Sequence, residues 1–234
     1  MRITLVGKLI ALAFLLSGTV AAQSVIFNAP STDTVESGKV YVEASFAARF
    51  KKYENGGFQG YGFRTVYGLD RRTEIGANFF VTRDGSGNLP REVQFNFKRK
   101  LYENEKHGVA VSAGGMVNVP LTKSAGPRPT AIVYAAASKT VPKLGTRLTG
   151  GMYHAIARKR DFGKMWGFIV GVEQPLNKRL SVIGDWFSGA NRYGYAFVGM
   201  NVAVTKRQFL SFGYNFGNTG VGENYFAITY GITF

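Results

Sequence analysis

Bulky and small side chains alternate along most of this chain, most clearly in residues 225–234. The bulky face of this stretch holds Phe226, Ile228, Tyr230, Ile232 and Phe234, and the opposite face holds Ala227, Thr229, Gly231 and Thr233. A period of two is the geometry of a β-strand, whose successive side chains point to opposite sides. No charged residue occurs here, so neither face resembles the solvated face of a soluble sheet.

The same alternation recurs between regularly spaced turn signals. About 9–11 tilted residues cross a bilayer as a β-strand, and the predicted segments have that length. They are 39–50, 58–69, 73–82, 92–102, 108–119, 130–140, 146–157, 165–174, 179–188, 193–204, 208–217 and 225–234. The faces of the segment 130–140 stay unassigned, because Ile132 and Val133 compete for the bulky side.

Charged residues within these segments lie on the face opposite the aromatic residues. In 165–174, for example, Glu173 opposes Trp166 and Phe168. Lipid can therefore meet the bulky face and a polar lumen the small one. A bilayer admits β-structure only when every backbone group is paired, which requires closure, and an even strand number returns the chain to its starting side. The sequence predicts an all-β, up-and-down antiparallel transmembrane β-barrel of about 12 strands.

The first 22 residues differ from the rest. Arg2 and Lys8 precede and flank an apolar stretch, and small residues follow, with Ala22 a suitable cleavage position. This layout predicts a cleavable signal peptide over 1–22; a buried N-terminal helix is the alternative. We expect an N-terminal periplasmic segment over 23–38 and one barrel over 39–234, with both termini periplasmic.

The formal charge is +15, or +13 once Arg2 and Lys8 are removed. Such a basic balance suits acidic lipid, anionic solutes or nucleic acid, and export argues against nucleic acid. The chain has no cysteine, so an exported form needs no oxidative pairing.

The alternating C-terminal strand, with Phe226, Ile228, Tyr230, Ile232 and Phe234 on one face, resembles that of bacterial outer-membrane β-barrel proteins. The resemblance covers residues 39–234. It implies that the barrel-assembly machinery reads this strand as a signal, and that outer-membrane lipid surrounds the protein. The chain is also loosely similar to small porin-like barrels grouped with phenol-degradation pathway proteins, although no diagnostic motif carries that narrower likeness.

Four aromatic residues are predicted to form a girdle at the outer membrane interface, where amphipathic rings gather. They are Trp166, Trp186, Tyr214 and Tyr225. A general preference of aromatic residues for strands explains the same pattern without a girdle.

The sequence offers little for catalysis. His107 lies in a predicted turn, whereas His154 is predicted to face lipid near the outer end of its strand. In this it is similar to outer-membrane phospholipase A, a twelve-stranded enzyme with a serine nucleophile two residues after its histidine. Ile156 occupies that place here. An interfacial ring is the alternative role for His154, and we expect neither enzyme activity nor a cofactor.

Ten charged residues are predicted to line the lumen, five acidic and five basic. They are Glu43, Arg49, Arg64, Glu74, Glu92, Lys98, Lys100, Arg147, Glu173 and Asp185. They could set the ion preference of a water-filled passage, or pair across the interior and close it. Inward Gly, Ala and Ser leave space, which favours a narrow channel. The sequence therefore predicts a passive porin-like channel for small polar or anionic solutes, with a structural or interaction barrel of occluded lumen as the alternative.

Overall fold

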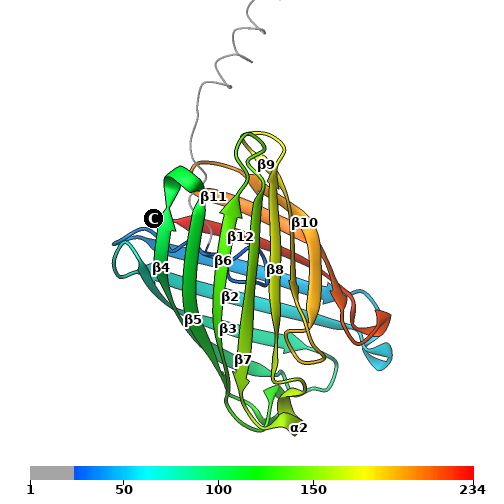
Figure 1. Ribbon diagram of the computed structural model, residues 1–234. Coiled ribbons are helices and arrows are strands. Elements are labelled where there is room, and N and C mark those ends of the chain that lie inside the picture. The colour runs from blue at the N-terminus through cyan, green and yellow to red at the C-terminus, as the bar shows by residue number, and fades with distance from the viewer. Residues whose placement is uncertain (1–23) are drawn as a thin grey trace, which may run out of the picture.

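The computed structural model describes residues 24–234, which form one closed antiparallel barrel (Figure 1). Each strand pairs with its neighbours in sequence, and the first pairs with the last. The predicted fold class is therefore confirmed. The strands of the described region are β1 (Val40–Arg49), β2 (Phe58–Gly68), β3 (Thr73–Arg83), β4 (Arg91–Asn104), β5 (Val109–Pro120), β6 (Thr130–Thr140), β7 (Arg147–Ile156), β8 (Trp166–Pro175), β9 (Leu180–Phe187), β10 (Tyr195–Ala203), β11 (Gln208–Gly217) and β12 (Tyr225–Thr233).

Every predicted segment coincides with one strand, including 130–140, whose faces the pattern left open. In β6 the side chain of Ile132 is buried and that of Val133 is exposed. Ile132 packs inside the barrel with Tyr134 and Ala29. Burial among lumenal side chains therefore sets the register of this strand.

Closure joins β1 to β12 in register, with Val42 opposite Ile232 and Phe46 opposite Ile228. Beyond the strand, the Phe234 N–H donates to the Val40 carbonyl at 2.8 Å. The bulky face of β12 thus continues the bulky face of β1 around the outside. No strand of the described barrel is left with an unpaired edge.

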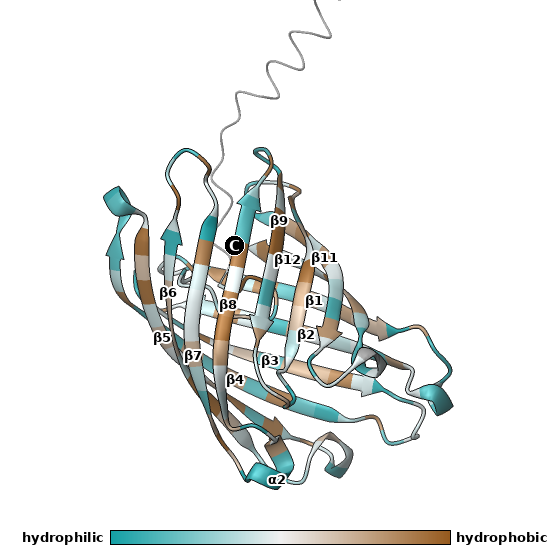
Figure 2. Cartoon of the chain, turned by 45° about the vertical axis from the view of Figure 1, so that its right-hand side comes forward, coloured by the Kyte–Doolittle hydropathy of each residue, from teal (hydrophilic) through white to brown (hydrophobic). Residues whose placement is uncertain are grey.

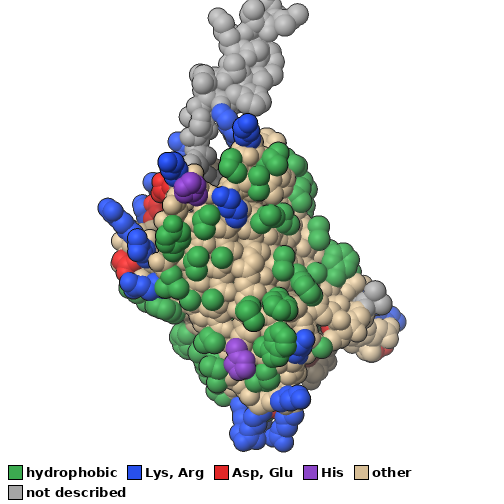
Figure 3. Space-filling model, in the orientation of Figure 1, with side chains coloured by type: hydrophobic (Ala, Val, Ile, Leu, Met, Phe, Trp, Pro, Cys, Tyr) green, Lys and Arg blue, Asp and Glu red, His purple; other side chains and the backbone are tan. Residues whose placement is uncertain are grey.

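The outer surface is apolar where a soluble protein would be polar. Exposed Phe, Val, Trp and Leu side chains follow the strands, and Figure 2 shows apolar stretches along them with hydrophilic connections at both ends. On the face shown in Figure 3, hydrophobic side chains cover the middle, while most Lys and Arg gather toward the ends. A polar interior inside an apolar, edge-free wall is the architecture of a membrane β-barrel.

Among residues 24–234, no helix is both long and apolar enough to cross a membrane.

The connections fall into two sets at opposite ends of the barrel. One end, here the short-turn end, has the connections 69–72, 105–108, 141–146, 176–179 and 204–207, and holds Val40 and Phe234. The other, the long-loop end, has 50–57, 84–90, 121–129, 157–165, 188–194 and 218–224, with α2 (Lys159–Phe162) in the fourth. The 3-10 helix η2 (Glu105–His107) contains His107, as a turn position predicts.

A labelling experiment tests this sidedness. Because the chain has no cysteine, single cysteines at Ser124 and Lys143 report opposite ends without background. Both positions are exposed. On whole cells, an impermeant thiol reagent should label Ser124→Cys and spare Lys143→Cys until the outer membrane is opened. Equal labelling of both variants on intact cells would contradict the predicted orientation.

The N-terminal residues take a different place from the one expected. The segment 23–38 is predicted to be periplasmic, yet residues 24–37, here the lumenal segment, fold into the barrel from the short-turn end. Ile26, Ala29 and Thr32 within it are buried. The predicted signal peptide, 1–22, and Gln23 lie outside the described residues.

Candidate functional site

The lumen is the candidate site, and its wall carries all ten charged residues that the alternation assigns to it. Their side chains share the inner face with the small residues of each strand. The structure also shows that most of them contact other groups of the lumen, above all the lumenal segment. The segment has three groups of polar contacts with the wall, which are described in turn.

The first contact is a tight turn closed around Asp185 of β9. Val25 and Pro30 form an isolated bridge, and the Ile26 N–H donates to the Ala29 carbonyl at 2.8 Å. Within the turn, the backbone N–H groups of residues 27, 28 and 29 donate to one oxygen of Asp185, at 2.9, 2.8 and 3.1 Å. Successive N–H groups that converge in this way form an anion-binding nest. Here the bound anion is a side chain of the barrel wall.

The second contact is a buried ion pair between Glu74 of β3 and Lys98 of β4, whose side chains are each 2% exposed and 3.1 Å apart. Glu74 accepts the Ser24 hydroxyl at 2.7 Å and the Val35 N–H at 2.8 Å. Lys98 donates to the Ser24 carbonyl at 2.6 Å. A buried ion pair is tolerated only when further hydrogen bonds satisfy its remaining atoms, and the lumenal segment supplies them.

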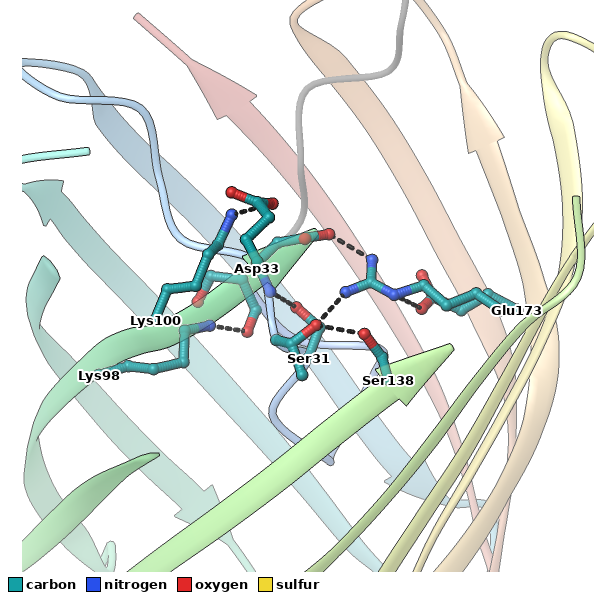
Figure 4. A network of polar contacts seen from close by, with 10 residues as sticks. Ser31, Asp33, Lys98, Lys100, Ser138 and Glu173 are labelled. Carbon is teal, nitrogen blue, oxygen red and sulfur yellow. Dashed lines mark hydrogen bonds and ion pairs between the residues drawn. The ribbon is translucent and has the colours of Figure 1, made fainter. Parts of the chain in front are cut away.

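The third contact centres on Arg147, at the start of β7. Its guanidinium forms an ion pair with Asp33 and donates to the Thr32 hydroxyl at 2.6 Å, while Nε lies 3.7 Å from Glu173. The Thr32 and Ser138 hydroxyls are 2.6 Å apart. Figure 4 shows Lys98 on one side of the network and Glu173 on the other, with Asp33 between them. The segment thus spans the lumen between distant strands.

Apolar contacts complete this packing. The Phe27 ring stacks on Phe197 of β10, with centroids 3.7 Å apart and planes 4° from parallel. Ile26 packs against Gly171 of β8, where an added Cβ would lie 2.1 Å from the Ile26 Cδ1. A side chain at position 171 would displace the segment. The thin inner face that suggested open space therefore makes room, at this point, for the protein's own chain.

The loop 188–194 narrows the lumen at the long-loop end. Arg192 donates to both oxygens of Glu92 at 2.6 and 2.9 Å, and the strands behind them, β9 and β4, stand nearly opposite in the ring. The Tyr193 ring packs against Phe187, and its hydroxyl accepts a hydrogen bond from the Asn118 amide. Burial raises the pKa of the Tyr193 hydroxyl, so the group stays protonated and neutral.

A cavity of about 300 Å³ lies between the lumenal segment and the wall formed by β1 to β5 and β12. A row of inner residues crosses it, with Glu43 opposite Arg64, Arg64 opposite Asn78 and Asn78 opposite Gln94. Asn78 donates to Gln94 at 2.7 Å, and Gln94 donates to Asn118 at 2.9 Å. This amide chain ends at Tyr193 and fixes the polar wall of the cavity.

Two other predicted lumen residues have local partners. Arg49, near the long-loop end, donates to the carbonyls of Asn224 and Gly56 at 3.0 and 2.9 Å. Lys100 pairs with Glu103 at 2.7 Å beside a bulge in β4. Both contacts stay within neighbouring strands and loops, so neither contact reaches the lumenal segment.

Three of the four predicted girdle residues, Trp166, Trp186 and Tyr214, have exposed side chains on the outer face. Tyr225 does not share their position. It pairs with the inward Asn215 and its ring contacts Phe58 and Tyr195 beside the cavity. The alternation that turns Phe226 outward turns its neighbour inward, so assigning Tyr225 to the girdle was wrong.

His154 faces outward, opposite Trp166 in the ladder of β7 and β8. Ile156 follows it on the same face and is 60% exposed. The side chain two residues after the histidine is therefore an aliphatic group that faces away from the lumen.

Comparison with solved structures places this architecture among known barrels. The KdgM porin superposes with a TM-score of 0.61 at 4% identity, over 83% of this chain and 98% of that one. The COG4313 outer membrane channel from Pseudomonas putida F1 superposes with a TM-score of 0.58 at 12% identity, over 87% of this chain and 98% of that one. No family model and no curated protein matches the sequence. At such identities the likeness establishes the fold alone.

Proposed function

We propose that the protein is a passive channel of the bacterial outer membrane for small polar or anionic solutes, and that the lumenal segment closes it at rest. One observation carries this proposal. Each strand pairs with two neighbouring strands and none pairs with the lumenal segment, so the segment can leave without breaking the wall. Its departure would leave a lumen lined by Glu74, Lys98, Arg147 and Asp185.

The balance of forces suits a movable segment. Ordering one residue's backbone costs about 1–2 kcal/mol, whereas a hydrogen bond exchanged with water contributes only about 0.5–1.5 kcal/mol net. The released groups would meet water in the lumen, so their hydrogen bonds would be replaced. The entropy lost on ordering the segment and the free energy gained from its hydrogen bonds are therefore of similar size. A small change in either can open the channel.

The solute class follows from charge. The basic residues that contact the segment are balanced by nearby acidic residues. The middle of the lumen therefore discriminates only weakly between anionic and cationic solutes. The chain carries +13 without Arg2 and Lys8 of the predicted signal peptide, and Lys and Arg side chains gather at the ends of the barrel, including the α2 end (Figure 3). A basic mouth concentrates anions. A barrel of similar fold, the KdgM porin, has been solved in complex with oligogalacturonate, which supports a solute in the lumen.

An occluded structural or interaction barrel is the second candidate, because the lumenal segment and the 188–194 loop narrow the lumen from both ends. Under either reading we infer outer-membrane lipid and the barrel-assembly machinery as partners, and a non-catalytic role. Single-channel recording of the purified protein in planar bilayers separates the two candidates. We expect brief openings with a reversal potential that indicates anion preference; persistent silence would support the occluded barrel.

A further inference from the structure

Two opposite charges face the lumenal cavity side by side without pairing. Glu43 and Arg64 are direct partners across the ladder of β1 and β2, and both line the cavity. Yet no ion pair joins them, and Arg64 has no ion-pair partner among the described residues. Glu43 is buried and Arg64 is half-buried. An unpaired charge that is withdrawn from water is costly, so this arrangement calls for an explanation.

The hydrogen bonds of both groups leave capacity unused. One oxygen of Glu43, which is 9% exposed, accepts the Tyr41 hydroxyl. Arg64 has a single long contact, 3.5 Å from the Ser24 hydroxyl, and its buried Nε has no hydrogen-bond partner. A guanidinium carries five donors, so most of its capacity remains for a ligand.

Apart from the amide row of Asn78 and Gln94, much of the cavity lining is apolar and aromatic. Phe27 of the lumenal segment, Phe80 of β3, Met116 of β5 and Tyr225 of β12 line it. A mostly apolar cleft with a few converging polar groups is typical of small-molecule sites, and about 300 Å³ lies at the lower end of their size range.

We infer that this cavity binds a small zwitterion with an apolar body, the class of α-amino acids with aromatic or aliphatic side chains. The ligand carboxylate lies against Arg64, whose planar fork matches it, and the ligand ammonium lies against Glu43. An anion alone would meet the repulsion of Glu43, and a cation alone that of Arg64. Only a ligand with both charges satisfies both residues.

This inference rests on the proposed channel function for the ligand's route into the lumen, but the binding itself needs no conduction. Isothermal titration of the purified barrel in detergent therefore tests it separately. The probes are L-phenylalanine, 3-phenylpropanoate, which lacks the ammonium, and phenethylamine, which lacks the carboxylate. Phenylalanine should bind saturably, and each single-charge probe should bind roughly tenfold or more weakly.

Charge-removing variants give a signature that a structural role would not produce. Glu43→Gln should weaken the binding of phenylalanine and strengthen that of 3-phenylpropanoate. Arg64→Gln should weaken the binding of phenylalanine and strengthen that of phenethylamine. Phe80→Ala keeps both charges, so it should weaken the binding of all three probes to a similar extent. Lys100→Gln, an inner charge outside the cavity, is the matched control and should leave phenylalanine affinity unchanged.

The outcomes separate the site from the channel. Equal affinity of wild-type protein for phenylalanine and for either single-charge probe would overturn the zwitterion site, as would absence of phenylalanine binding to barrels shown to be folded by their heat-shifted gel mobility. A barrel that conducts ions but binds no phenylalanine overturns this inference alone. One that binds phenylalanine but never conducts supports the site and contradicts the channel.

Discussion

Deletion of residues 24–36 is expected to change the barrel from briefly opening to persistently open, with a several-fold rise in time-averaged conductance. The deletion removes the turn that holds Asp185 and the groups that satisfy Glu74 and Lys98. These charges then face water, so their desolvation is relieved rather than left uncompensated. The strand ladder is intact without the segment, and the barrel should still form.

The measurement is single-channel recording of the deletion variant beside wild type, with folding checked by gel mobility. Asp185→Asn is the milder variant, because it keeps the shape but weakens charge-assisted hydrogen bonds worth about 1.5–3 kcal/mol each. It should give openings of intermediate duration. Asp70→Asn, in a turn outside the lumen, should behave as wild type. A folded deletion variant that opens no more often than wild type would show that another element blocks the passage.

Phe234→Ala is expected to lower the yield of protein in the outer membrane sharply while leaving refolding into detergent nearly unchanged. Full burial of such a ring contributes roughly 1.5–3 kcal/mol to the free energy of unfolding. Phe234 is 61% exposed, so removal of its ring should destabilise the folded barrel by less than that. Assembly is different, because the resemblance to outer-membrane barrels implies that the terminal aromatic belongs to a recognised signal. Membrane fractionation and in vitro refolding measure the two effects separately.

Thr233→Ala is the matched control, since Thr233 lies next in sequence but pairs with Tyr41 on the inner face. It should affect neither yield nor refolding. If Phe234→Ala reached the membrane at the wild-type level, the terminal strand would lose its role as a signal. A refolding defect of the same size would instead assign Phe234 a structural role.

The wall of the barrel could be read from the sequence because its rule is local. Lipid selects bulky side chains on one face of every strand, so alternation alone separates Phe212 from Ser211 and Trp166 from Gly167. Where both neighbours are aliphatic, as at Ile132 and Val133, the rule gives no answer. The buried cluster that Ile132 forms with Tyr134 of the same strand and Ala29 of the lumenal segment then decides.

The contents of the lumen could not be read in this way. Residues 24–37 show no period of two, and their place depends on partners far away in sequence, such as Asp185 and Glu74. The pattern placed both acids inside, but nothing local indicated that backbone N–H groups would meet Asp185. Inward Gly and Ser residues were the available signal. They indicated space, yet could not tell solvent from a segment of the same chain.

Oxidative locking of the lumenal segment tests the gated channel most directly. The Thr32 and Ser138 hydroxyls are 2.6 Å apart, so Thr32→Cys with Ser138→Cys brings two sulfurs within disulfide reach in a chain that has no other cysteine. We predict that the oxidised double variant, with its crosslink verified by mass, is silent in planar bilayers. Reductant should restore wild-type openings. Neither oxidation nor reduction should change the openings of the two single-cysteine variants. Unchanged conductance in the crosslinked barrel would contradict closure by the lumenal segment.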